Sequence, residues 1–248
     1  MHRLPLFATA IALAGFAIIT QPAAVSSFPD VLLWAWESKQ DLRFIAPHTA
    51  GIAFLERTVW LYPQRVIARP RSQPLLYTPG TPLIAVVRIE RPSGVGRELP
   101  LAHDAAAAAA EAAKHPGLSA VQIDFDAQLS ERSWYASFVR ELRQAVPRSM
   151  PITMTALESW CEERSKWLDR LPVAEATPML FRMGPNQNRS PLGFSTAACN
   201  SSAGVATDEM PERIPGGPRR IYIFHPGPWN EADYQTAMDR VSAWRARQ

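Results

Sequence analysis

The stretch AVQIDFDAQLSE, residues 120–131, places two aspartates inside an aliphatic run. Side chains i and i+2 of a β-strand share a face, so Asp124 and Asp126 point one way while Ile123 and Phe125 point the other. In a parallel barrel each strand is buried on both sides, with an apolar face toward the helices and a variable face toward the lumen. The stretch therefore predicts a barrel strand whose aspartates face the lumen, with Asp126 at the mouth.

Seven further apolar runs rich in β-formers recur along the chain. The eight runs together span residues 31–37, 51–56, 83–90, 120–126, 151–157, 177–184, 203–209 and 220–226. Helical patterns separate several of these runs. One is an alanine-rich stretch over 103–117, and another covers 130–147 with Ser130 as its expected N-cap. A last helix is expected over 231–245, after the final run. Eight strands alternating with helices predict an α/β fold, an irregular (β/α)8 TIM-like barrel.

Two local patterns refine this fold. Residues 57–82 predict a β-hairpin inserted after the second strand, with its turn at YPQR, residues 62–65. No glycine-rich nucleotide turn follows the first strand, which argues against a dinucleotide-binding fold.

The first 27 residues have the pattern of an export signal peptide, with a basic start, an apolar run and small residues near Ser26. The apolar run is shorter than the ~20 residues of a membrane span, so cleavage is favoured over a permanent membrane anchor, which stays the alternative. Residues 28–248 are then expected to form a single domain, periplasmic or extracellular, without a stable membrane span.

The composition excludes several classes of protein. A content of 47% hydrophobic and 20% charged residues is not that of a disordered chain. The arginines are scattered rather than gathered into a stripe, so no nucleic-acid partner is expected. Cys161 and Cys199 are the only cysteines, and in an exported chain such a pair predicts a disulfide. No metal site and no cofactor are expected, because no spaced histidine pair accompanies the aspartates.

The candidate site residues lie at the C-terminal ends of the predicted strands, where the chemistry of such barrels collects. The candidate catalytic residues are Asp124, Asp126, Asp208 and Glu209, and the candidate ligand-binding residues are Glu37, Arg88, Glu90, Trp160, Arg182, His225 and Trp229. Trp160 and Trp229 are expected to offer platforms for sugar rings. Neighbouring carboxylates that are partly desolvated titrate as a pair, which supplies the acid and the base that glycoside hydrolysis needs.

Several ordered blocks of the chain resemble an uncharacterised bacterial family of exported proteins, a domain of unknown function grouped with the glycosidase-type TIM barrels. The blocks include VLLWAWE (31–37), ITMTALESWC (152–161), PMLFRMG (178–184), GVATDE (204–209) and IYIFHPGPW (221–229). The resemblance covers residues 30–230 and implies the barrel fold, but it brings no reaction and no catalytic residues with it.

The fourth strand is also similar to a known catalytic motif. QIDFDAQ, residues 122–128, resembles the D-x-D-x-E pattern of chitinase-type barrels, which ends in the catalytic glutamate. Gln128 occupies that last position here, and Glu131 lies three residues further along. A glutamine cannot donate a proton as a carboxylic acid does, so the chitinase mechanism is not expected to carry over.

Three functions remain open. The chain is a carbohydrate hydrolase, a non-catalytic barrel that binds cell-envelope glycans, or a scaffold in which Arg88 and Arg182 neutralise the aspartates for stability alone. The carboxylates at the mouth favour the hydrolase over the scaffold, whereas Gln128 favours binding over chitinase-like hydrolysis. We expect a glycoside-hydrolase-like barrel that acts on a carbohydrate, with the carbohydrate-binding barrel as the alternative.

The export signal leads to a first test. We expect the secreted protein to begin near Ser27, because the apolar run precedes that residue and no basic stop-transfer cluster follows it. N-terminal sequencing of the secreted form checks this. A full-length chain that keeps Met1 and sediments with membranes contradicts cleavage and identifies the apolar run as an anchor.

Overall fold

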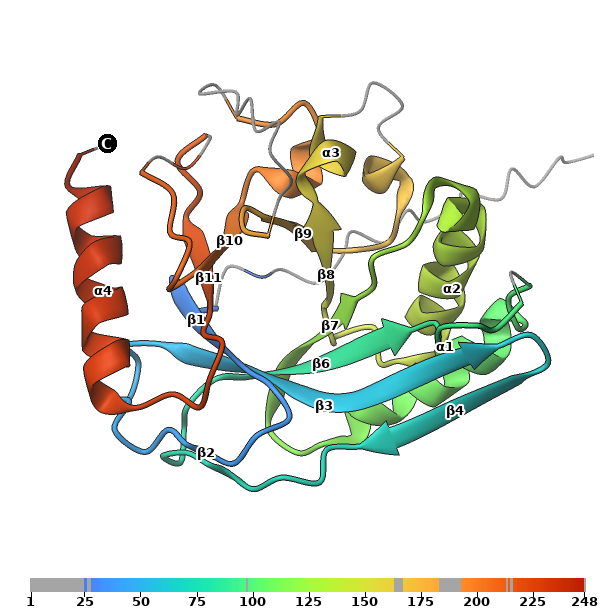
Figure 1. Ribbon diagram of the computed structural model, residues 1–248, viewed down its shortest axis with the longest axis horizontal. Coiled ribbons are helices and arrows are strands. Elements are labelled where there is room, and N and C mark those ends of the chain that lie inside the picture. The colour runs from blue at the N-terminus through green and yellow to red at the C-terminus, as the bar shows by residue number, and fades with distance from the viewer. Residues whose placement is uncertain are drawn as a thin grey trace, which may run out of the picture.

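Eight parallel strands close into a barrel in the computed structural model (Figure 1), which describes residues 25, 28–96, 98–162, 167–182, 193–212, 214 and 216–247. The strands are β1 (Val31–Ala35), β3 (Gly51–Tyr62), β6 (Leu83–Glu90), β7 (Leu118–Asp124), β8 (Ile152–Leu157), β9 (Glu175–Met179), β10 (Ser202–Ala206) and β11 (Arg220–Phe224). Strand β1 pairs in parallel with both β11 and β3, which closes the barrel. Each of the eight predicted runs overlaps one of these strands, so the predicted closed parallel barrel is confirmed.

The second barrel strand extends beyond the barrel into a hairpin. Strand β4 (Arg65–Pro70) pairs antiparallel with the outer half of β3, from Tyr62 opposite Arg65 to Arg57 opposite Pro70. The turn lies at the predicted position, but the hairpin starts within the second strand rather than after it. The residues of β3 from Arg57 onward pair with β4 on one edge and, after a register shift between Leu55 and Arg57, with β6 on the other edge. The barrel strand and the first strand of the hairpin are therefore one continuous strand. Two short strands, β2 (Gln40–Asp41) and β5 (Leu75–Leu76), form a separate sheet.

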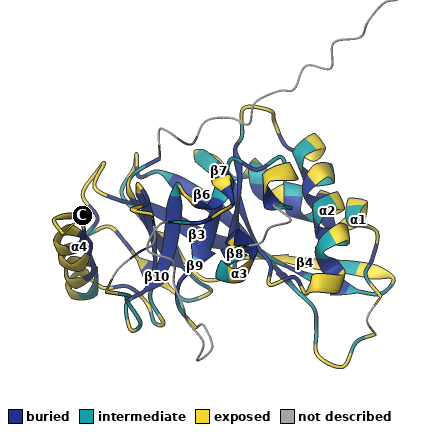
Figure 2. Cartoon of the chain, turned by 90° about the horizontal axis from the view of Figure 1, so that it is seen from above, coloured by how far each residue is buried: buried dark blue, intermediate teal, exposed yellow. Residues whose placement is uncertain are grey.

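Helices cover the barrel incompletely. Three are longer than two turns, α1 (Ala102–Ala110), α2 (Arg132–Ala145) and α4 (Glu231–Arg245). The others are α3 (Glu158–Cys161) and the 3-10 turns η1 (Glu111–Lys114), η2 (Leu129–Glu131), η3 (Leu168–Arg170) and η4 (Ala197–Cys199). Within the described residues no helix lies between β10 and β11. Figure 2 shows the barrel strands largely buried, and β4 and the outer faces of α1, α2 and α4 exposed.

The start of α2 differs from the sequence-based expectation. The one-turn helix η2 leads directly into α2, and the cap of this continuous helical segment is Gln128, the N-cap of η2, rather than Ser130. The Glu131 carboxylate accepts a hydrogen bond from the backbone N–H of Gln128 at 2.7 Å, and the Gln128 side chain caps the backbone of Glu131 in return. The two residues therefore form a capping box.

The two faces of β7 pack as its alternating sequence predicts. Ile123 and Phe125 belong to the large core between strands and helices, where the Phe125 ring meets Tyr135 of α2 edge-on at 5.2 Å. On the lumen side, Gln122 accepts a hydrogen bond from Trp34 Nε1 at 2.8 Å. Trp34 fills the lumen so closely that a Cβ on Gly204 would lie 2.8 Å from its ring. The lumen is therefore a packed core and not a pore.

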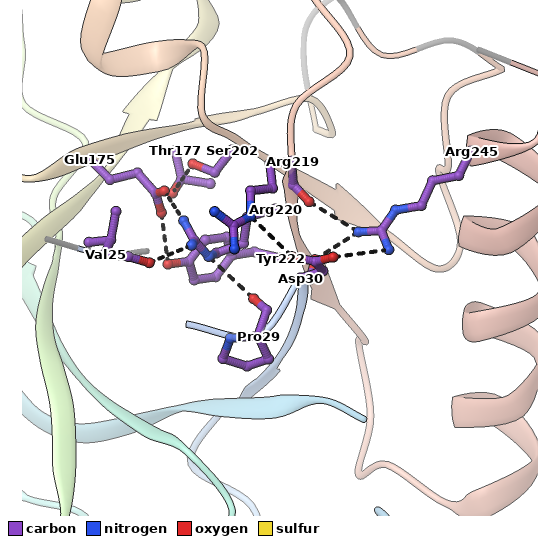
Figure 3. A network of polar contacts seen from close by, with 10 residues as sticks. All are labelled: Val25, Pro29, Asp30, Glu175, Thr177, Ser202, Arg219, Arg220, Tyr222 and Arg245. Atoms are coloured by element: carbon purple, nitrogen blue, oxygen red, sulfur yellow. Dashed lines mark hydrogen bonds and ion pairs between the residues drawn. The ribbon is translucent and has the colours of Figure 1, made fainter. Parts of the chain in front are cut away.

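A buried ion pair lies at the N-terminal end of the lumen (Figure 3). Glu175 and Arg220 are the first residues of β9 and β11, and both are fully buried, at 0% and 2% exposure. Arg220 Nη1 donates to Glu175 Oε2, and the Tyr222 hydroxyl donates to Glu175 Oε1 at 3.0 Å. Arg220 also donates to the carbonyl oxygens of Val25 and Pro29, which ties the segment before β1 to the barrel floor. The sequence analysis identified neither member of this pair.

The predicted disulfide is confirmed. Cys161, at the end of α3, and Cys199, at the end of η4, are bonded with a Cα–Cα distance of 5.8 Å. Their separation of 38 residues corresponds to a stabilisation of ~4 kcal/mol in the chain-entropy model. Such a bond is typical of a chain that matures in an oxidising compartment.

The N-terminal segment is largely outside the described residues. The predicted signal peptide over 1–27 falls there except for Val25, so its cleavage stays a prediction. In the part of the chain that is described, no helix has the length and apolar character needed to cross a membrane.

The floor ion pair gives a stability prediction. Glu175→Gln keeps the shape of the side chain but leaves Arg220 buried without its counter-charge, so we expect the free energy of unfolding to fall by ~3–5 kcal/mol. Urea denaturation followed by far-UV circular dichroism measures the loss. The matched control is Asp30→Asn, which breaks exposed pairs with Arg219 and Arg245 and should cost less than ~1 kcal/mol. Equal losses in the two variants would contradict a special role for the buried pair.

Candidate functional site

Three carboxylates surround one guanidinium at the mouth of the barrel. Arg88 of β6 donates from Nη1 to Asp124 Oδ2 at 2.8 Å and from Nη2 to Asp126 Oδ2 at 3.1 Å. Its Nε lies 3.6 Å from Glu90 Oε1. Arg88 and Glu90 are next-but-one neighbours near the end of β6, and Asp124 ends β7 directly opposite Arg88 in the sheet register. We call these four residues the Arg88 cluster; if all are ionised, its acids outnumber its one base by two charges.

The three carboxylates differ sharply in exposure. The Asp124 side chain is 3% exposed, whereas those of Asp126 and Glu90 are 47% and 44% exposed. Asp126 and Glu90 can therefore meet a ligand from solvent. Asp124 holds the cluster together from beneath, because it also accepts a hydrogen bond from Thr155 Oγ1 of β8 at 2.7 Å.

Burial and charge set the protonation of this cluster. Burial raises the pKa of Asp124 and outweighs the Arg88 charge and the Thr155 hydrogen bond, both of which lower it. For Arg88 the balance is reversed. Burial lowers the pKa of Arg88, but the charges and hydrogen bonds of Asp124 and Asp126 raise it by more. The net shift of the pKa is therefore upward, and Arg88 stays a cation. The site therefore combines a fixed positive charge with a buried carboxyl group that resists ionisation.

Tyr135 of α2 is a buried polar residue that the sequence analysis did not single out. Burial raises its pKa well above the ordinary value, and the charges of Asp124 and Asp126 add to this effect. Its hydroxyl has no hydrogen-bond partner among the described residues. Tyr135 lies on the buried face of α2 with Phe138, Val139 and Leu142. The helical pattern of the sequence gave no sign that its hydroxyl would be unpaired.

The position of the chitinase-type glutamate has a structural role in this chain. Gln128 caps α2, as described above, and its partner Glu131 is buried and forms an ion pair with Arg91. Glu131 is thus fixed in the cap and does not replace the missing glutamate. The expectation that the chitinase mechanism does not carry over is consistent with this geometry.

The other two candidate catalytic residues lie in a second cluster, centred on Arg182. Arg182 follows β9, and its side chain donates to Asp208 Oδ2 at 2.6 Å and to Glu209 Oε2 at 3.1 Å. Its backbone N–H also donates to Glu209 Oε2 at 2.8 Å. The hydrogen bond from Arg182 lowers the pKa of Asp208. Strands β8 and β9 separate β7 from β10, and no ion pair among the described residues joins the two clusters.

The expectation that Trp160 and Trp229 form sugar platforms is wrong. Both are buried, at 2% and 4% exposure. Trp160 packs against Tyr135 and Trp167, and Trp229 Nε1 donates to the Trp34 carbonyl oxygen at 2.9 Å. Loop position alone did not reveal this burial, since it depends on tertiary neighbours distant in the sequence.

Other aromatic side chains are half-buried at the C-terminal ends of the strands. The rings of Phe181 and Phe224 stack with centroids 5.5 Å apart and an interplanar angle of 4°. Trp36, which follows β1, meets Phe224 edge-on at 6.3 Å. We call these three residues the mouth aromatics. Their partial exposure leaves apolar ring surface available at this end of the barrel.

The remaining candidates, Glu37 and His225, have local partners. Glu37 accepts hydrogen bonds from Ser72 and Gln73; burial raises its pKa, but these bonds outweigh that effect and lower it. The Nδ1 atom of His225 lies 2.9 Å from Thr207 Oγ1, and its Nε2 lies 3.4 Å from Asp233 Oδ2. Thr207, His225 and Asp233 line a cavity of about 210 Å³. Nowhere in the described part of the chain do three His, Cys, Asp or Glu residues form a group able to hold a metal ion.

Comparison of the chain with protein-family models, with curated proteins and with solved structures finds no match. The family resemblance described above therefore stays a prediction. The roles of the site residues have to be argued from geometry and tested directly.

The raised pKa of Asp124 predicts a pH dependence of stability. The folded chain keeps the Asp124 proton to higher pH than the unfolded chain does, so the free energy of unfolding falls as the pH rises from the ordinary value of 3.8 through the raised pKa. Asp124→Asn should remove this fall. The free energy of unfolding of the variant minus that of the wild type should therefore increase as the pH rises. A constant difference in stability caused by the lost carboxylate does not affect this trend.

Urea denaturation at a series of pH values measures this difference. The control is Asp239→Asn, an exposed carboxylate on α4 that contacts Gln235, which should keep the slope of the wild type. A variant at position 124 that follows the wild-type slope would show that folding leaves the pKa of Asp124 unchanged. A variant that loses stability relative to the wild type as the pH rises would show that the ion pair with Arg88 outweighs burial.

Proposed function

We propose that the chain is an exported, glycoside-hydrolase-like (β/α)8 barrel that acts on a polysaccharide or cell-envelope glycan through carboxylates at the barrel mouth. The observation that carries the proposal is the Arg88 cluster. It joins a buried carboxyl group of raised pKa to two accessible carboxylates at the ends of neighbouring strands, where barrel enzymes place their chemistry.

The residues divide into roles by exposure. Asp126 and Glu90 are the groups expected to reach the ligand, and glycoside hydrolysis needs two such groups as acid and base or nucleophile. Asp124 is a positioning residue that orients Arg88 from beneath. The mouth aromatics offer ring surface for the apolar faces of sugars, and the Arg182 cluster offers donors and acceptors for hydroxyl groups. The disulfide and the resemblance to exported barrel proteins agree with a site of action outside the cytoplasm.

A second candidate function is non-catalytic carbohydrate binding, which a specific observation favours. The motif position that ends in a catalytic glutamate in chitinase-type barrels is Gln128, and both Gln128 and Glu131 are engaged in the cap of α2. In that case the same carboxylates accept hydrogen bonds from sugar hydroxyls without cleaving the glycosidic bond. A third reading, in which the clusters serve only stability, predicts no ligand at all.

Asp126→Asn separates these functions, because it removes the charge but keeps the shape of an exposed side chain. We expect the variant to lose ~100-fold or more in the release of reducing sugar from a panel of polysaccharides and peptidoglycan. Its thermal midpoint should stay close to that of the wild type, because exposed ion pairs contribute little. Asp239→Asn on α4 is the matched control and should behave as wild type.

The outcomes distinguish the candidates. A wild type that releases no sugar but is retarded in gels containing one of these glycans, with retardation lost in Asp126→Asn, supports the binding barrel. A wild type that neither binds nor cleaves any glycan, together with an Asp126→Asn variant that unfolds much more easily, refutes both and leaves the scaffold.

A further inference from the structure

A second cavity lies on the outside of the barrel, and neither Arg88 nor Arg182 lines it. It has a volume of about 350 Å³ and lies between β10, β11 and α4. Val205 and Ile221 face it from the strands, and Val241 and Trp244 face it from α4, which stands beside β11 in Figure 1. In the described residues the chain between β10 and β11 contains no helix, so among these residues α4 is the helix that faces the cavity.

The charges around this cavity are of one sign. Of the described residues that line it, Arg240 and Arg247 are the only charged ones, and both are exposed. Arg240 Nη1 donates to the Thr207 carbonyl oxygen at 3.0 Å, which fixes its guanidinium at the rim. Among the described residues neither arginine forms an ion pair with a carboxylate, in contrast to Arg88 and Arg182 at the mouth. An apolar hollow thus has two cations at its edge that no described acid neutralises.

We propose that this cavity binds a single-chain amphiphile with an anionic head group, of the fatty-acid type. The chain would lie between the aliphatic residues of β10 and β11 and those of α4, and the head would meet Arg240 and Arg247. A carboxylate is ionised at neutral pH, and the guanidinium group matches its geometry with paired N–H donors. The volume falls in the range of small-molecule sites, ~300–1,000 Å³.

The chemistry of the walls argues against a sugar here. None of the described residues that line the cavity has an acidic side chain to accept hydrogen bonds from hydroxyl groups. The Trp244 ring is buried at 6% exposure, so it offers no open face for stacking. The inference is independent of the proposed function, because it uses neither the Arg88 cluster nor the mouth aromatics.

Isothermal titration calorimetry with dodecanoate, dodecanol and dodecyltrimethylammonium, all below micellar concentration, tests the proposal on the mature chain. We expect dodecanoate to bind at one site, at least about tenfold more tightly than dodecanol, and the cation to give no detectable binding. Arg240→Gln combined with Arg247→Gln should weaken dodecanoate by about tenfold or more and change dodecanol little. Arg148→Gln, an exposed arginine before β8, is the matched control and should bind as wild type.

A filling variant tests the position of the chain. Ala243 lines the cavity from α4 and is itself exposed, so Ala243→Trp should fill the hollow and abolish binding of both dodecanoate and dodecanol, with the fold checked by circular dichroism. A wild type that does not bind dodecanoate, or that binds the three probes equally, overturns the proposal. So does unchanged dodecanoate affinity in the double arginine variant or in folded Ala243→Trp.

Discussion

The ion pair between Arg220 and Glu175 is the interaction on which the inside of the barrel depends. Two charges placed in a packed lumen are tolerated only if each finds its partner and its remaining hydrogen bonds, since the cost of burying an unpaired charge is large. Tyr222 and the carbonyl oxygens of Val25 and Pro29 complete that requirement. The pair therefore links β9, β11 and the segment before β1.

The upper end repeats the same chemistry with a different balance. The floor pairs one base with one acid and is closed to solvent, whereas Arg88 faces three acids, two of which are half exposed. An arrangement built for stability alone would match charges, as the floor does. The surplus of acid at the mouth is consistent with a surface that meets a ligand, and the difference between the two ends is the best structural reason to look for function there.

Much of this fold is predictable from periodicity, and the misses have physical causes. Alternation along β7 correctly assigned Asp124 to the lumen, because the face of a strand residue is a local property. The cysteine pair was likewise predictable from number and compartment. Glu175 and Arg220 were missed, because their pairing joins residues 45 positions apart and only the closed barrel brings them together. Trp160 and Trp229 were placed at the surface for the same reason, since burial depends on neighbours that sequence position does not reveal.

The closure of the barrel has a consequence for how the chain folds during synthesis. Strand β1 pairs with β3, which is available early, and with β11, which begins at Arg220 near the far end of the chain. The seam between β1 and β11 therefore stays open until the chain has emerged through β11. Contacts of such long sequence separation form slowly, because the entropy of a long loop is lost before they are made. An unfinished chain would expose the edges of β1 and β10, so an early stop in translation should leave a species that is prone to strand exchange with its neighbours.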